Sequence, residues 1–184
     1  SAEYWSSGAA LTHVDVSGAT DLQLPDNLRI YLIAGTGHGH SGFVDGRPAH
    51  SGGLLLPPNP NDPGLIEAPL VESFTRWGMQ DEQPPESSYP RLDKGELVAV
   101  EQFSFPAMKG VAAPALVELH PRFGWGSRFS KGILDNALPV PGELFPVLVP
   151  VVGEEGNETS GITTPLVAVP VARYTGRNYP ADRK

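Results

Sequence analysis

The sequence predicts an α/β fold, and it does so through one strand–helix unit followed by a tail of irregular strands. Residues 28–33 form a short apolar run rich in β-branched and aromatic residues, which is typical of a buried strand. Residues 66–79 show helical spacing of apolar side chains, and strand-like runs recur from Leu97 onward. Because the repeated β–α alternation of a complete parallel sheet is missing, we interpret the chain as part of a larger α/β fold.

The first elements follow from local residue chemistry. A short helix is expected near residues 4–13, and the following Asp15, Ser17, Gly18 and Asp21 are typical turn and capping residues. The strand at 28–33 then leads into a glycine-rich loop over residues 34–53. Four prolines between Pro57 and Pro63 exclude helix or central strand from the next connection.

The predicted helix over residues 66–79 places Leu70, Phe74 and Trp77 at positions i, i+4 and i+7, which gives one apolar face. Gly78 and the later pair Pro84–Pro85 end it. The strand-like runs further on are 98–100, 147–152 and 166–171, separated in part by a turn at 153–158. We expect four aromatic side chains to pack in a core or an interface, namely Trp77, Phe123, Trp125 and Phe129.

Composition limits the class of protein. The chain has 184 residues, which is enough for one domain with a real core. A net charge of −8 with 13 basic residues argues against nucleic acid as a partner. Cysteine is absent, which excludes disulfides and thiol catalysis but leaves the compartment open, a secreted or periplasmic location included. No apolar run approaches the roughly 18 residues of a spanning helix, and the first residues, which do not include Met, do not resemble a signal peptide. We expect a processed chain or a fragment.

Several blocks of residues resemble one group of large bacterial proteins with an α/β-hydrolase domain. The blocks occur in order along nearly the whole chain and are residues 3–5, 13–21, 29–39, 84–92, 105–111, 156–162 and 174–178. The resemblance implies that this chain is the carboxyl-terminal portion of an α/β-hydrolase fold. Residues 1–92 would be part of the hydrolase core, and residues 93–184 an irregular, proline-rich β extension packed on that core.

The resemblance also implies a mechanism. An α/β-hydrolase uses a serine nucleophile, an acid and a histidine in that chain order. Here Glu3 precedes a helix, the strand 28–33 follows, and His38 comes directly after that strand. Glu3 would then accept the Nδ1 hydrogen of His38, and His38 would act as general base and acid on a carboxylic ester. The resemblance implies no cofactor and a small-molecule ester as substrate.

Other interpretations of the same residues stay open. Glu3 could be a solvated terminal carboxylate, whereas Asp15 and Asp21 are competing acids in capping positions. His38 and His40 share one face of an extended segment and could ligate a metal if a third ligand converged on them. The acidic residues Glu154, Glu155 and Glu158 are interpreted as a solvated turn, because they lack the alternating ligands of a calcium loop.

The nucleophile itself is not found. No Gly-x-Ser-x-Gly segment occurs, and Ser41, Ser51 and Ser73 lack the strand–turn–helix setting that activates a serine. We therefore expect this chain to act as a serine hydrolase only together with the remainder of the hydrolase, in the same chain or a separate one. The alternative is a non-catalytic interaction module that uses the proline-rich loops as a partner surface.

Overall fold

A computed structural model describes residues 1–38, 43–44, 47–48, 56, 58–108, 119–136 and 138–176 of the chain. Its α-helices there are α1 (Ala2–Ser6), α2 (Gly64–Gln80) and α3 (Pro165–Ala168), with 3₁₀ turns at Ala9–Thr12, Val100–Gln102 and Phe129–Lys131. Its strands are β1 (Phe43–Val44), β2 (Arg47–Pro48), β3 (Leu97–Ala99), β4 (Pro121–Gly124), β5 (Val140–Leu144) and β6 (Leu148–Pro150).

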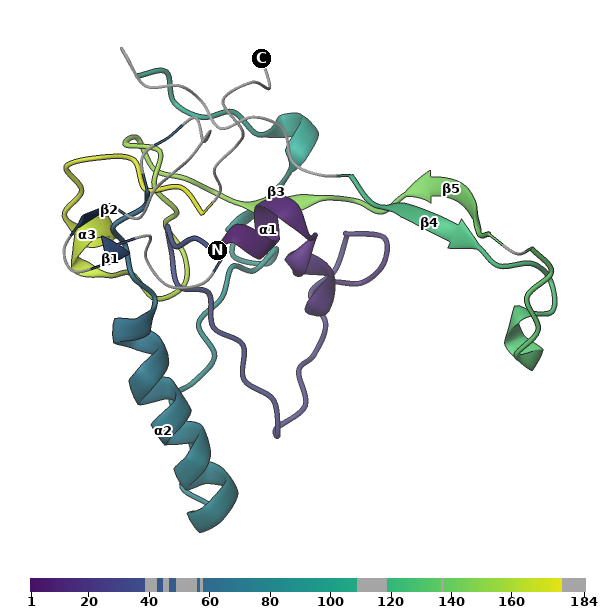
Figure 1. Cartoon of the computed structure of the whole chain (residues 1–184), viewed down its shortest axis with the longest axis horizontal. Helices are drawn as coiled ribbons and strands as arrows, with labels where there is room; N and C mark the ends of the chain where they lie inside the picture. The colour runs from purple at the N-terminus through teal and green to yellow at the C-terminus, as the bar shows by residue number, and fades with distance from the viewer. Residues whose placement is uncertain are drawn as a thin grey trace.

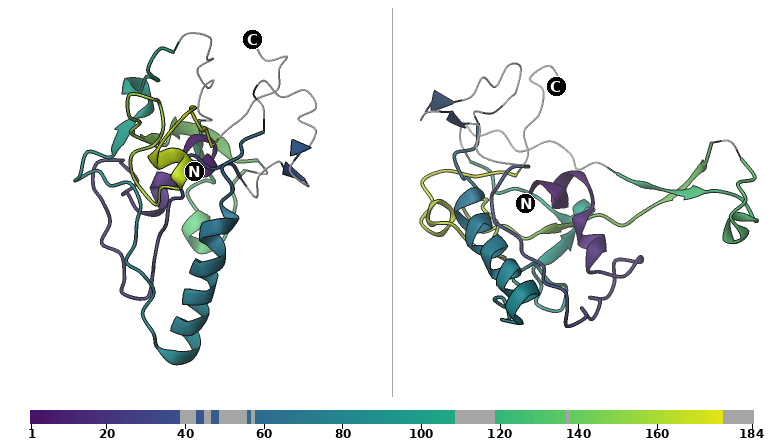
Figure 2. Two further views of the ribbon diagram at one scale, coloured as in Figure 1. Left: turned by 90° about the vertical axis from the view of Figure 1, so that its left-hand side faces the viewer. Right: turned by 60° about the horizontal axis from the view of Figure 1, so that its bottom comes forward.

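These strands form small antiparallel sheets within the part of the chain that the structure describes. The pairs are β1–β2, β3–β6 and β4–β5. Figure 1 shows that the β4–β5 hairpin extends far from the rest of the chain, and that α2 projects in a different direction. Both projections are also visible after rotation (Figure 2). Every residue of β5 is exposed, whereas every residue of β6 is buried, so β6 belongs to the core and β5 to the projecting arm.

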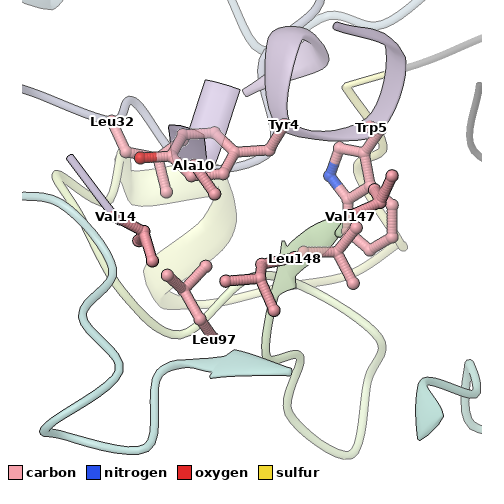
Figure 3. Packing of buried hydrophobic residues seen from close by; sticks show 9 residues of the cluster. Tyr4, Trp5, Ala10, Val14, Leu32, Leu97, Val147 and Leu148 are labelled. Atoms are coloured by element: carbon pink, nitrogen blue, oxygen red, sulfur yellow. The ribbon is translucent and has the colours of Figure 1, made fainter. Parts of the chain in front are cut away.

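The main core joins residues from both halves of the chain (Figure 3). Its buried members are Tyr4, Trp5, Ala10, Val14, Leu32, Leu97, Val147, Leu148 and Val149. Trp5 stacks on Phe105 with ring centroids 5.4 Å apart and meets Phe103 edge-on at 5.0 Å. Because α1 and β6 share this cluster, the first helix is fixed by side chains more than 140 residues away in sequence. The proposed division at residue 92 stays a prediction.

Among the described residues, the predicted strand at 28–33 forms two isolated parallel bridges and no longer strand, one bridge between Tyr31 and Ser88 and one between Ile33 and Ile162. Their hydrogen bonds use the backbone groups of Ile30, Leu32 and Ala34. The N–H groups of Tyr31 and Ile33 make no hydrogen bond with any other described residue. Backbone groups of alternate residues in an extended segment point to opposite sides. On the second side, the Ile33 carbonyl accepts from the Ser1 nitrogen at 3.4 Å and from the Thr36 hydroxyl at 2.7 Å.

The helix predictions have mixed outcomes. The helix predicted over 66–79 is confirmed by α2, which is two residues longer at its start and ends with Asp81 in a left-handed conformation. No residue of α2 is buried, although Phe74 contacts the ring of Tyr31 at 5.9 Å. The helix expected near 4–13 is divided into α1 and a 3₁₀ turn by Gly8, whose φ is 62°.

The strand predicted at 166–171 is wrong, because residues 165–168 form α3. Pro165 occupies the first turn of this helix, where its fixed φ is favourable and its missing N–H costs nothing. The carbonyl of Thr164 accepts from the N–H groups of Val167 and Ala168. The strands predicted at 98–100 and 147–152 are confirmed in their centres by β3 and β6.

The aromatic residues of the β4–β5 arm do not pack in the core of this chain, and the alternative of an interface stays a prediction. Phe123 is 49% exposed and Phe129 is 53% exposed. They pack against Trp125, with centroids 6.3 Å and 5.8 Å from its ring, so the three rings cover one another on the arm. Trp77, on α2, packs under the guanidinium of Arg29 at 5.0 Å.

Candidate functional site

Helix α1 presents Glu3 on its outer side. The neighbouring Tyr4 and Trp5 are 6% and 7% exposed, and both anchor the helix in the core. The Tyr4 hydroxyl hydrogen-bonds to Nε2 of His13 at 2.7 Å, and Trp5 Nε1–H donates to Glu158 at 2.7 Å. With these two side chains directed inward, the Glu3 side chain is directed outward and stays 46% exposed.

His38 follows the extended segment 30–34, and its ring lies against Glu3. His38 Nδ1 is 2.5 Å from Glu3 Oε1, which is a short hydrogen bond between residues 35 positions apart. The His38 side chain is 88% exposed, and it makes no other hydrogen bond to the described residues. The structure therefore brings together the two residues that the sequence analysis singled out.

The Glu3 carboxyl is ionised at neutral pH. Its partial burial alone would raise its pKa, but the hydrogen bond from His38, together with a backbone hydrogen bond, holds the pKa below its usual value. Since an ionised carboxylate can only accept, Nδ1 of His38 carries the hydrogen and donates it. Nε2 of a neutral His38 then bears the lone pair, and this nitrogen faces solvent on an exposed side chain.

Buried amides hold the loop that leads to His38. Asn61 is 2% exposed, donates from Nδ2 to the carbonyl of Ala34 at 2.8 Å and accepts from the Thr164 hydroxyl at 2.6 Å. Asn59 Nδ2 donates to the carbonyl of Gly35 at 2.7 Å. Sequence reasoning missed these roles by interpreting residues 57–64 as a connection. The available signal was two asparagines among prolines, since Asn readily satisfies backbone groups in such loops.

The interpretation of the acidic residues 154–158 as a solvated turn is wrong for Glu158. Glu154 and Glu155 are exposed, but Glu158 is only 5% exposed. Its Oε1 accepts from Trp5 Nε1 at 2.7 Å, and its Oε2 accepts from the N–H of Gly35 at 2.7 Å. The carboxylate is buried because it satisfies two donors from segments far away in sequence, which no local pattern of charges reveals.

The competing acids have structural partners. Asp15 accepts from the backbone N–H groups of Ser17, Ala19 and Thr20, as its predicted turn role requires. Asp21 accepts from the N–H groups of Leu92 and Asp93 and so joins two loops. Neither residue forms a described hydrogen bond to a histidine.

The remaining candidates are distributed as follows. His40, Ser41, His50 and Ser51 lie outside the described residues. Ser73 donates to the carbonyl of Pro69 on α2, as a helical serine commonly does. Within the described ranges, no three His, Asp or Glu side chains converge in a way that could hold a metal ion.

A groove of about 1060 Å³ lies away from the Glu3–His38 pair. It is lined by residues from 21–29, 83–96 and 159–161, and neither Glu3 nor His38 belongs to its walls. Its lining is polar and includes Arg29, Arg91 and Lys94 beside Asp21 and Asp93. The Glu3–His38 pair therefore lies outside this groove.

His38 is an exposed imidazole that donates through Nδ1 to an ionised carboxylate, on a loop that follows an extended apolar segment, and such an arrangement can take up and release a proton at Nε2. The family model described as "Alpha/beta hydrolase domain" matches residues 5–183. The chain belongs to this family. No curated protein and no solved structure matches it significantly. Among the described residues, no helix has the length and apolar character needed to cross a membrane.

Proposed function

We propose that this chain supplies the catalytic histidine and acid of a serine hydrolase that cleaves carboxylic esters. The carrying observation is the 2.5 Å hydrogen bond between His38 Nδ1 and Glu3 Oε1. The family match supports hydrolase chemistry, and the order acid–histidine in this chain agrees with the order of such triads. The ester preference rests on the chemistry common to the fold.

The geometry supports a definite sequence of proton transfers. His38 Nε2 takes the proton of a serine hydroxyl as that oxygen attacks the ester carbonyl, and the imidazolium is stabilised by the Glu3 carboxylate. His38 then donates this proton to the alkoxide leaving group. In the second half, Nε2 takes a proton from water, the resulting hydroxide attacks the acyl-enzyme, and the proton returns to the serine oxygen. Glu3 stays ionised throughout.

We propose further that the serine and the oxyanion-hole donors lie in the remainder of the hydrolase, outside this chain. No Gly-x-Ser-x-Gly segment is present in the 184 residues.

The test uses the complete hydrolase, purified natively. A fluorophosphonate that reacts with activated serines should label sequence outside residues 1–184, and intact mass after denaturation locates the label. His38→Ala should lower kcat on a p-nitrophenyl ester by at least about 10³-fold, and Glu3→Gln by about 10²–10⁴-fold.

Glu72→Gln provides the matched control, because Glu72 is an exposed carboxylate on α2 that contacts only Arg76 at 3.8 Å among the described residues. It should leave kcat unchanged. Full activity in His38→Ala, or a lone 184-residue chain that no serine reagent labels and no partner joins, would overturn the proposal and favour a non-catalytic interaction module.

A further inference from the structure

We propose that Glu158 is a positioning residue for the Glu3–His38 pair. This inference rests on the proposed function and extends it to a residue that does not touch substrate. Its carboxylate holds helix α1 and the His38 loop at a fixed separation by accepting one hydrogen bond from each. The two side chains that must meet, Glu3 and His38, are attached to these two segments.

Each hydrogen bond of Glu158 ends close in sequence to one member of the pair. Trp5 lies two residues after Glu3, and Gly35 lies three residues before His38. Both hydrogen bonds measure 2.7 Å, and each ends on a different carboxylate oxygen. Any shift of Glu158 therefore displaces α1, the loop or both.

Glu158 is buried, whereas the two side chains that it would position are not. Glu158 is 5% exposed, whereas the Glu3 and His38 side chains are 46% and 88% exposed. Exposed side chains have little packing to fix them, so the distance between Nδ1 and Oε1 depends on the backbone beneath them. A buried carboxylate with two charge-assisted hydrogen bonds supplies that rigidity, since such bonds are short and strong.

Other hydrogen bonds also hold the loop that leads to His38. Asn59 and Asn61 hold the carbonyls of Gly35 and Ala34, but neither contacts α1 through a described hydrogen bond. A second link between the helix and the loop runs from the Ser1 hydroxyl to the carbonyl of Thr36, at 3.1 Å. The Ser1 nitrogen adds two bonds to the same residue, to the Thr36 carbonyl at 3.1 Å and to the Thr36 hydroxyl at 2.9 Å, and all three bonds from Ser1 are longer than the two bonds of Glu158.

The experiment measures ester hydrolysis by the complete hydrolase. Glu158→Gln keeps the size of the side chain but directs an amide N–H₂ at one of two N–H donors. We expect kcat to fall by about 10–100-fold, because small displacements of reacting groups have effects of this size, while KM stays within about two-fold. Glu155→Gln, which removes an exposed carboxylate from the same turn, should leave both constants unchanged.

A double-mutant cycle separates positioning from general stability. If Glu158 acts through the pair, Glu158→Gln should lower kcat by less than about three-fold when Glu3→Gln is already present. An equal loss in both backgrounds, or wild-type kcat in Glu158→Gln, overturns the inference. If Glu158→Gln does not fold, Trp5→Phe removes the Nε1 donor while keeping a ring in the core, and it should show the same dependence on Glu3 with a smaller loss.

The same data distinguish the two proposals. If His38→Ala and Glu3→Gln keep full activity, the proposed function fails whatever Glu158→Gln does. If those two variants are inactive and both Glu158→Gln and Trp5→Phe match the wild type, only the positioning role fails.

Discussion

The most direct physical prediction concerns His13, a histidine that is 0% exposed. Its Nε2 meets the Tyr4 hydroxyl, its Nδ1 has no hydrogen-bond partner in the described structure, and its ring lies 4.7 Å from that of Tyr89. Burial lowers the pKa of His13, the Asp21 carboxylate opposes this effect, and Arg91 adds to it. The folded protein therefore keeps His13 neutral at pH values where the unfolded chain protonates it.

The sign of the effect on stability follows from this difference. Below the unfolded pKa of about 6.5, the unfolded state binds one proton more than the folded state, so the free energy of unfolding falls as the pH falls. The slope reaches at most about 1.4 kcal/mol per pH unit. One unit below pH 6.5 the loss from His13 alone is therefore at most about 1.4 kcal/mol, a sizeable part of a typical 5–15 kcal/mol.

The assay is urea unfolding between pH 5 and pH 8, followed by tryptophan fluorescence. Trp5 reports on the same core because it stacks on Phe105 and meets Phe103 edge-on. His13→Gln removes this titration, so the difference in slope between wild type and variant isolates His13 from the other histidines. Identical slopes, or an NMR titration that puts the pKa of His13 at or above 6.5 in the folded protein, would refute the reasoning.

Three further predictions concern buried amides, turns and backbone conformation. Asn61→Ala should lower the free energy of unfolding in urea by about 2–5 kcal/mol, because it leaves the Ala34 carbonyl and the Thr164 hydroxyl unpaired in the interior. A loss below about 1 kcal/mol would contradict this prediction. Gly161→Ala should cost clearly more than Gly95→Ala in thermal unfolding, because both have positive φ but a Cβ at Gly161 would lie 2.5 Å from the Leu32 carbonyl oxygen; equal losses would show that the backbone there yields. A ¹³C titration of Asp15 should give a pKa of about 2, held low first by the Ser17 hydroxyl and then by backbone N–H groups, and Ser17→Ala should raise it.

The sequence predicts those parts of this molecule that depend on near neighbours. Helix α2 follows from the spacing of Leu70, Phe74 and Trp77, and the turn at Asp15 follows from its capping chemistry. The run 166–171 misleads because its valines favour a strand, while one proline at the start of α3 favours a helix.

The candidate site also has parts that depend on near neighbours in the sequence and parts that do not. The segment before His38 and its glycine-rich end are visible in the sequence, and the resemblance indicates Glu3 as the acid. The supports are not visible, because Glu158 contacts Trp5 and Gly35 across 153 and 123 residues. Its neighbours Glu154 and Glu155 have the same chemistry but are exposed, so composition alone does not separate the buried carboxylate from the solvated ones.

The two hydrogen bonds of Glu158 join segments that lie far apart in the sequence. Closing loops of this length costs more conformational entropy than closing a local turn, so contacts of this kind form late. A nascent chain that ends before residue 158 contains Glu3, His38 and the segment between them. It lacks the Glu158 carboxylate, which joins helix α1 to the loop before His38. During synthesis, Glu3 and His38 acquire this joint restraint only after residue 158 has been made.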